Sequence, residues 1–193
     1  MKTLQLPLTE EDVRGLALGD AVSLTGTIFT ARDAAHKYLV ENPDFSRIPD
    51  IRGSVLYHCG PVIIKQDGRY VVTAAGPTTS IREEPYMATV IEKYGIRAII
   101  GKGGMGPATA EACRRFGCVY LSAVGGAAQV LASCVKEVPS VSMLEEFGAP
   151  EAIWQLNVVD FPAVVTMDAT GASLHQQVKA RSEAQLATIN SAH

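Results

Sequence analysis

The segment from Val71 to Met105 constrains the fold most, because strand-like and helix-like patterns alternate along it. It begins with a short apolar run, Val71–Ala75, that is rich in β-forming residues. This run stops at Gly76–Ser80, whose glycine, proline and hydroxyl residues are typical of turns and helix starts. Apolar residues then recur at helical spacing until Gly95, which predicts a helix that ends there.

The same order follows a second time. The apolar run Arg97–Ile100 leads into the glycine-rich turn Gly101–Gly106, and Pro107 opens a predicted helix, Pro107–Phe116. Two strands that each run into a helix predict an α/β fold with parallel βαβ units in a mixed sheet. We expect the two strands to be a parallel pair, so that both turns lie at the carboxyl edge, where open α/β sheets bind ligands.

The two turns carry side chains suited to binding anions. Arg82 follows the first turn and Lys102 lies in the second, while Thr78 and Thr79 supply hydroxyl groups between them. Helix N-termini add free N–H groups and a partial positive charge. We therefore expect a ligand with two negative groups, such as a dicarboxylate or a phosphate.

The glycine turn has other interpretations. Gly101–Gly106 satisfies G-x-G-x-x-G, but the next predicted strand, Cys118–Val124, ends without the acidic residue that binds a ribose. A nicotinamide-dependent dehydrogenase is therefore disfavoured. A P-loop fails as well, because Pro107 stands where Lys-Ser/Thr would be needed. A tight turn with positive φ explains the glycines but not Lys102 between them.

The first third of the chain reads as mostly antiparallel β-structure with one helix, Ala31–Glu41. Thr30 and Asp33 fit a capping box at the start of that helix. Arg32 and His36 are four residues apart, which predicts a shared and solvated helix face. The other expected elements are a capped turn at Thr9–Asp12, strands at Met1–Leu8, Ala21–Phe29, Ser54–Tyr57 and Val62–Ile64, a hairpin turn at Asp67–Gly68, a helix at Ala127–Cys134, an extended Val135–Met143, a turn at Glu145–Pro150, a strand pair within Ala152–Val165 and a helix from Gln176 onward.

Composition limits the function classes. The chain has 193 residues, 47% of them hydrophobic, so residues 1–193 can form a single domain with a sizeable core. A net charge of −3 gives no electrostatic case for nucleic acid, and no apolar run reaches membrane-spanning length. The N-terminus lacks a signal-peptide pattern, and the four cysteines lie far apart without a CxxC pair. We expect a cytoplasmic protein with reduced thiols and no metal held by this chain alone.

Three motifs in order give a specific resemblance: Thr30–His36, Gly76–Ser80 with Arg82, and Gly101–Pro107. Together they resemble the β subunit of the iron–sulfur, class I type of fumarate hydratase and tartrate dehydratase. The C-terminal domain of single-chain class I fumarases is similar. The resemblance runs over nearly the whole chain and includes Tyr57–Pro61, Pro150–Trp154 and Asp168–Gly171.

The resemblance implies a swivelling β/β/α domain whose active site lies between two subunits. The α subunit would carry a [4Fe–4S] cluster on three cysteines, and no cysteine of this chain corresponds to them. An α2β2 assembly, or a homodimer of the isolated chain, is expected. Substrate-binding residues would be Arg32, Arg82, Lys102, Thr79 and Gly103.

The resemblance also implies the reaction, reversible hydration of fumarate to malate, with Thr78 as the base that removes the C3 proton. A hydroxyl is a poor base unless its pKa is lowered, so we keep His36 as the second candidate for proton transfer. One departure from the family pattern concerns Arg82, which is followed by Glu83-Glu84 instead of methionine and an acidic or amide residue. We expect both carboxylates to lie in the first helical turn and to favour its dipole.

Two alternatives stay open at this level. The chain could be a tartrate dehydratase β subunit, which would make oxaloacetate. It could also be a dicarboxylate-binding or regulatory module without chemistry of its own.

Overall fold

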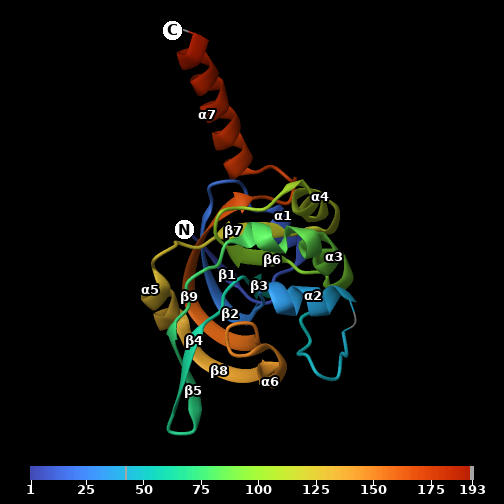
Figure 1. The fold of residues 1–193 in the computed structure, drawn as a ribbon, viewed down its shortest axis with the longest axis vertical. Helices are drawn as coiled ribbons and strands as arrows, with labels where there is room; N and C mark the ends of the chain where they lie inside the picture. Colours follow the sequence, from blue (N-terminus) through green and yellow to red (C-terminus); the bar gives the residue numbers. More distant parts are fainter. Residues whose placement is uncertain (42, 192–193) are drawn as a thin grey trace.

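The computed structural model describes residues 1–41 and 43–191, and it has a mixed α/β architecture around one large sheet (Figure 1). The sheet has the strand order β1-β2-β3-β6-β7-β9-β8. Neighbours from β1 to β7 are parallel, whereas β8 and β9 run antiparallel. The strands are β1 (Lys2–Gln5), β2 (Ala21–Thr30), β3 (Val55–Tyr57), β6 (Ala98–Gly101), β7 (Val119–Ser122), β8 (Val135–Ser142) and β9 (Ile153–Met167).

A second pairing partly closes this sheet. Strand β9 pairs antiparallel with β2 as well as with β7, so β2, β3, β6, β7 and β9 form a barrel-like ring. Its interior is filled by large apolar side chains, among them Tyr57, Trp154 and Phe161, all at most 1% exposed. The expectation of a mixed sheet with parallel βαβ units is confirmed.

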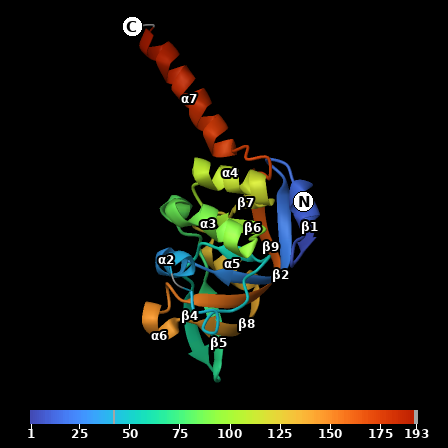
Figure 2. The same cartoon turned by 90° about the vertical axis from the view of Figure 1, so that its right-hand side faces the viewer.

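Three helices cover one outer face of the parallel strands: α2 (Asp33–Glu41), α3 (Glu84–Tyr94) and α4 (Pro107–Phe116) (Figure 2). Each buries an apolar stripe, such as Met87, Val90 and Ile91 on α3. The strands beneath are short and buried on both faces, as parallel strands covered by helices must be. Both predicted βα turns therefore face the edge at which β3 and β6 end.

The predicted parallel pairing of Val71–Ala75 with the Arg97 strand is wrong. The segment belongs to β5 (Arg69–Ala74), which pairs antiparallel with β4 (Val62–Gln66) in a separate two-stranded hairpin. The hairpin turn at Asp67–Gly68 is confirmed, and both residues have positive φ. A short apolar run does not reveal its partner, and the place beside β6 is filled by β3.

The first third is also not mainly antiparallel, because β1, β2 and β3 pair with one another in parallel. Helix α1 (Glu10–Arg14) connects β1 to β2, and α2 follows β2. The capping box at the start of α1 is confirmed: the Asp12 amide donates to Thr9 Oγ1, and the Thr9 amide donates to the Asp12 carboxylate.

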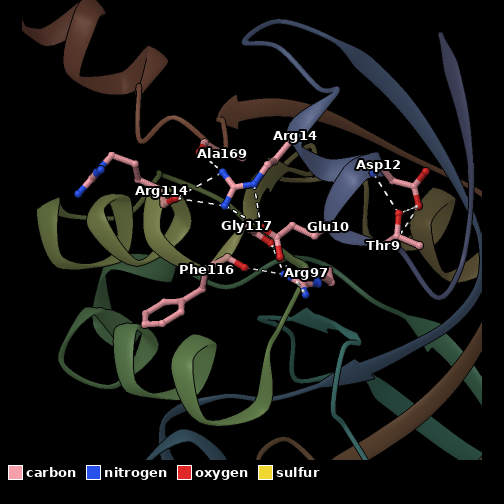
Figure 3. A network of polar contacts seen from close by, with 9 residues as sticks. All are labelled: Thr9, Glu10, Asp12, Arg14, Arg97, Arg114, Phe116, Gly117 and Ala169. Atoms are coloured by element: carbon pink, nitrogen blue, oxygen red, sulfur yellow. Dashed lines mark hydrogen bonds and ion pairs between the residues drawn. The ribbon is translucent and has the colours of Figure 1, made fainter.

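The amino ends of the parallel strands hold a polar network around α1 (Figure 3). Arg97, just before β6, donates to the carbonyls of Phe116 and Gly117 at the end of α4. Its guanidinium also lies 3.6 Å from Glu10, which accepts a hydrogen bond from Arg14. This network ties α1, β6 and the C-terminus of α4 together.

The C-terminal part follows the sequence expectations with two changes. Helix α5 (Ala128–Cys134) and β8 are confirmed, but the expected turn after Met143 contains a short helix, α6 (Leu144–Phe147). The expected strand pair is one long strand, β9, with Asp160 at positive φ and irregular register near it. Helix α7 (Leu174–Ser191) projects from the body (Figures 1 and 2). Within the described ranges, no helix is long and apolar enough to cross a bilayer.

Candidate functional site

The first turn joins the second one by backbone hydrogen bonds, although β5 is not in the main sheet. The Lys102 amide donates to the Thr78 carbonyl, and the Ser80 amide donates to the Lys102 carbonyl at 3.0 Å. Thr79 and Lys102 thereby form an isolated parallel bridge. The Thr78 amide donates to the His58 carbonyl at 2.7 Å, just after β3. The carboxyl edge of β3 and β6 therefore brings Thr78, Thr79 and Lys102 onto adjacent backbone positions.

Lys102 is exposed, and no carboxylate pairs with its ammonium among the described residues. Thr78 is half-buried and its hydroxyl makes no hydrogen bond within the same residues. Thr78 does not cap a helix: Thr79 is the N-cap of a single 3-10 turn, Ser80–Glu83, and makes no side-chain cap bond. Both Lys102 and Thr78 thus have polar groups available to a ligand.

The glycines of the second turn have separate reasons. A Cβ at Gly101 would collide with Ser80 Oγ, which accepts a hydrogen bond from buried Tyr120. Gly103 and Gly104 have φ of 82° and 77°, a region that only glycine occupies easily. Gly103 is exposed beside the Thr79 methyl group. These contacts fix the backbone on both sides of Lys102.

The N-terminus of α4 is already occupied, which corrects the expectation that it receives the ligand. Glu84 accepts hydrogen bonds from the amides of Gly106, Ala108 and Thr109, and from the Thr109 hydroxyl at 2.7 Å. A Cβ at Gly106 would lie 2.6 Å from Glu84 and would displace the carboxylate that caps α4. Glu84 does begin α3 as expected, but its carboxylate caps the neighbouring helix.

The two arginines of the predicted site are held by carboxylates. Arg82 binds Asp33 through two of its nitrogens and is about half exposed. Arg32 lies 3.3 Å from Glu151, and the Glu151 carboxylate also accepts from the Ala34 amide at 3.0 Å. Asp33 therefore pairs with Arg82 instead of closing a capping box, and Glu151 supplies the cap of α2.

The predicted capping role of Thr30 is wrong as well. Its hydroxyl donates to the Ala152 carbonyl and accepts from the Trp154 amide at 3.0 Å, which ties β2 to β9. Arg32 lies close to Gly60, where a Cβ would come within 2.7 Å of the guanidinium. The close packing at Gly60 and the ion pair with Glu151 hold Arg32 at the base of α2.

His36 lies in the interior, so the expectation of a solvated face for it is wrong. It is fully buried, with Nδ1 3.0 Å from the Arg32 carbonyl and 3.5 Å from Glu83. Its ring makes an edge contact with the ring of buried His58, with centroids 4.9 Å apart. Burial lowers the pKa of His36 to about 4, although the Arg32 carbonyl and Asp33 act in the opposite direction. Both imidazoles are therefore neutral near pH 7, because burial also lowers the pKa of His58.

Glu83 completes this interior group. It was expected in the first turn of the helix, favouring its dipole, but it is the last residue of the 3-10 turn that precedes α3. It is fully buried, and burial raises its pKa to about 7. Asp33 and Glu151 raise this pKa further, whereas Arg82 and Arg32 oppose them. A carboxyl group in such surroundings is protonated in part at neutral pH.

The structure thus assembles most residues that the sequence suggested, in two layers. Thr78, Thr79, Lys102 and Gly103 lie together at the surface turns, and Arg32, Arg82 and His36 lie around the start of α2. Sequence reasoning missed the roles of His58, Glu83, Glu84 and Glu151. His58 and Glu151 stand in segments that carried the family resemblance, and Glu83-Glu84 is the departure from its pattern.

The four cysteines are the side chains of this chain that could bind an iron–sulfur cluster. Cys59 is buried just after β3, Cys113 on α4 and Cys118 just after α4 are buried beside each other, and Cys134 is partly buried on α5. Over residues 1–41 and 43–191, no group of three or more His, Cys, Asp or Glu side chains is placed to hold a metal ion. The donor set of this chain does not fit a [4Fe–4S] cluster, which needs cysteine thiolates gathered at one place.

Comparison with known proteins extends over the same residues. The model of the family described as Fumarase C-terminus matches residues 2–178. The chain is 54% identical over 178 residues to a putative fumarate hydratase class I from Geobacillus stearothermophilus. That alignment covers 92% of this chain and 34% of the relative, so the chain spans about a third of that protein.

Two further relatives are of similar length to this chain. A putative L(+)-tartrate dehydratase subunit beta from Methanocaldococcus jannaschii is 42% identical over 174 residues, or 89% of each chain. The L(+)-tartrate dehydratase subunit beta of Escherichia coli K12 is 37% identical over 175 residues, 90% of this chain and 86% of the relative. Because the family model matches residues 2–178, a range that includes all three motifs, the chain belongs to the fumarase C-terminus family.

Proposed function

We propose that the chain is the β subunit of a two-subunit iron–sulfur hydro-lyase that hydrates fumarate reversibly to (S)-malate. The observation that carries this proposal is the carboxyl edge, where Lys102 and the Thr78 hydroxyl, neither with a side-chain partner among the described residues, lie on hydrogen-bonded backbone segments. Two further cations belong to the candidate site, Arg82 paired with Asp33 and Arg32 paired with Glu151. The relative with 54% identity, named as a class I fumarate hydratase, supports fumarate as the substrate.

In this proposal, the chain binds one end of the dicarboxylate. The Lys102 ammonium is the main anchor, because no carboxylate of the described residues competes for it. Arg82 and Arg32 contribute less direct charge, since Asp33 and Glu151 already balance them. A charge-assisted hydrogen bond to a carboxylate contributes roughly 1.5–3 kcal/mol.

The chain also transfers the C3 proton. In the dehydration direction, the Thr78 alkoxide would accept this proton at Oγ1 and become the neutral hydroxyl, which would return the proton to C3 in hydration. The hydroxyl needs its pKa lowered for this role, which the nearby Lys102 cation can assist. His36 is second to Thr78, because its imidazole is fully buried and cannot touch substrate from this surface.

The [4Fe–4S] cluster implied by the family resemblance would be held by the α subunit. An α2β2 assembly and a cytoplasmic location remain predictions. The names of two relatives as beta subunits support a partner chain of this kind.

A tartrate dehydratase β subunit is the second candidate. It is favoured by the two relatives so named, of which the chain covers 89% and 86%. The two candidates share the proton-transfer group, Thr78, and the three cations Lys102, Arg82 and Arg32, which we call the substrate clamp. They differ only in the hydroxyl pattern of the substrate, for which the described residues of this chain offer no separate recognition group beyond Thr79.

The test is anaerobic co-production of this chain with its α subunit, followed by assays with fumarate and with L-tartrate. Conversion of fumarate to malate, and none by either chain alone, is the expected result. Preferred dehydration of tartrate would favour the second candidate. Dicarboxylate binding by calorimetry without turnover in the assembled complex would contradict both enzymatic proposals.

A further inference from the structure

The unsatisfied polar atoms of the interior are concentrated in one place. Six buried side-chain nitrogen or oxygen atoms in the described part of the chain lack a hydrogen-bond partner, and they belong to Arg32, His36, His58 and Glu83. Both oxygens of Glu83 and both ring nitrogens of His58 are among them. Buried polar groups are nearly always paired, and leaving one unpaired is unfavourable. A concentration of unpaired groups at one point therefore requires an explanation.

The same residues connect the three segments of the candidate site. Glu83 directly follows Arg82, and His36 lies three residues after Asp33, the ion-pair partner of Arg82. The His58 ring packs against the His36 ring, and the His58 carbonyl accepts a hydrogen bond from the Thr78 amide. Contacts among these three interior side chains therefore set the relative positions of the 3-10 turn, the start of α2 and the Thr78 backbone.

We propose that Glu83 and His36 form a buried positioning pair for the substrate clamp, which holds the Arg82 turn in place while Glu83 is protonated and releases it when Glu83 ionises. The inference rests on the proposed function for its substrate, but its structural part concerns this chain alone. Neither residue touches the substrate, so both act through Arg82 and Asp33.

The charges around the pair explain why the Arg82 turn is held in place while Glu83 is protonated. Asp33 on α2 and Glu151 before β9 are the carboxylates nearest to Glu83, and both oppose a further negative charge. Arg82 and Arg32 favour that charge, but each is already engaged with one of those carboxylates. His36, the ring next to Glu83, is neutral and donates no positive charge.

An ionised Glu83 would be a buried carboxylate without a hydrogen-bond donor, which is strongly unfavourable. Two responses can relieve it: the turn Ser80–Glu83 can move toward solvent, or His36 can take up a proton. Movement of the turn is favoured, because Ile81 and Arg82 of this turn are already exposed, whereas an imidazolium at His36 would be fully buried with no partner for Nε2 among the described residues. Arg82 would move with the turn, away from Asp33.

The structural part is tested by amide hydrogen exchange of the full chain between pH 6 and 8.5. After correction for the intrinsic pH dependence, amides of residues 80–84 should exchange about tenfold faster at the upper pH. Glu83→Gln keeps the shape and cannot ionise, so it should abolish this acceleration. Glu83→Met is the second variant, should the amide not be tolerated. The matched control is Glu92→Gln, which makes the same change at an exposed position of α3.

The functional part uses the assembled enzyme. The KM for the dicarboxylate should rise about tenfold from pH 6 to 8.5 in the unmodified enzyme, the loss expected for one charge-assisted hydrogen bond. In Glu83→Gln, the KM should stay flat across this range, while kcat at pH 6 stays near that of the unmodified enzyme. A purely structural role for Glu83 would lower stability without changing the pH profile of KM.

Each part has its own contrary result. Exchange of residues 80–84 that is independent of pH, or equally dependent in Glu83→Gln, would overturn the positioning pair. Accelerated exchange with an unchanged KM would overturn its link to the clamp. Failure to hydrate fumarate or dehydrate tartrate would count against the proposed function, and the exchange result would stand apart from it.

Discussion

The two ends of strand β6 carry polar networks of opposite character. At the amino end, Arg97 caps the last carbonyls of α4, and Glu10 pairs with Arg14 (Figure 3). Every buried side-chain nitrogen or oxygen of Arg97, Glu10 and Arg14 has a hydrogen-bond partner. At the carboxyl end, by contrast, Glu83 and the two histidines are fully buried with unpaired atoms.

This difference separates a structural network from a candidate functional one. The charged side chains at the amino end are partly exposed and paired with one another. They therefore connect the elements without a large desolvation free energy. At the carboxyl end, within the described residues, buried groups lack hydrogen-bond partners and the exposed Lys102 has no carboxylate partner. Perturbed pKa values and unsatisfied polar atoms are typical of functional sites, and here they coincide. Substitutions at the two ends should therefore affect different quantities.

The largest effect is expected for Thr78→Ala. Removal of a proton-transfer group lowers kcat typically 10²- to 10⁴-fold. Because the Thr78 hydroxyl makes no hydrogen bond among the described residues, the melting temperature should hardly change. The assembled enzyme should also lose exchange of the malate C3 proton with solvent.

Thr79→Ala is the matched control for that experiment, since it removes the adjacent hydroxyl of the same turn without a cap bond. It should be milder in kcat. Equal effects of the two variants, or a larger effect of His36→Gln, would show that the proton acceptor is not Thr78.

The second effect concerns stability as a function of pH and compares Glu83 with its own variant. Between the ordinary carboxyl pKa of 4.5 and about 7, folded Glu83 keeps a proton that the unfolded chain has lost. Stability therefore falls as pH rises through this window. The difference of about 2.5 in pKa corresponds to roughly 3 kcal/mol at most.

His36 partly masks this effect in the unmodified chain. Its pKa is lowered from 6.5 to about 4, so its contribution to stability is lost as pH falls through that range. The measured quantity should therefore be the difference in unfolding free energy between Glu83→Gln and the unmodified chain. The unfolding free energy of Glu83→Gln minus that of the unmodified chain should increase from pH 4.5 to 8. A constant difference would mean that the pKa of Glu83 is the same in the folded and the unfolded chain.

Much of this fold was predictable from periodicity, because the helices and the buried parallel strands have strong and regular patterns. The pairing of β5 was not predictable, since a five-residue apolar run fits a hairpin as well as a central strand. The parallel pairing of β1 with β2 and the antiparallel pairing of β2 with β9 were not predictable either, because local sequence does not encode the partner of a strand.

The surface half of the candidate site was predictable because turn chemistry and charge are local. Lys102 within a glycine turn is such a signal. The interior half was not, because Glu83 and Glu84 are identical neighbours in the sequence. One caps α4 with four hydrogen bonds and the other has none, and only the packing of α2, α3 and α4 decides between them.

The next effect is on substrate binding at the carboxyl end. Lys102→Met should raise the KM for the dicarboxylate about ten- to hundredfold, from the loss of one charge-assisted hydrogen bond. The unfolding free energy should stay within about 0.5 kcal/mol, because no carboxylate loses a partner. Lys37→Met, at an exposed position of α2, serves as control and should leave KM unchanged.

A smaller change is expected for Glu84→Ala, which tests whether every carboxylate at this end is functional. Loss of the α4 cap should lower the unfolding free energy by about 2 kcal/mol, the upper range for a helix cap. The pH profile of KM should keep the form of the unmodified enzyme. A changed profile with unchanged stability would remove the distinction between Glu83 and Glu84.

The smallest effect is expected at the amino end, from Glu10→Gln. The Glu10 carboxylate is about half exposed and contacts Arg14 and Arg97. Exposed ion pairs contribute about 0–1 kcal/mol and are weakened by salt. The amide retains an oxygen that can accept from Arg14, so urea unfolding should show a loss below about 1 kcal/mol that shrinks in 1 M salt. Arg97 would keep its bonds to the carbonyls at the end of α4, and kcat and KM should both stay unchanged. A pH profile of KM that differs from that of the unmodified enzyme would mean that the amino end also positions the substrate-binding residues, and the contrast between the two ends of β6 would then fail.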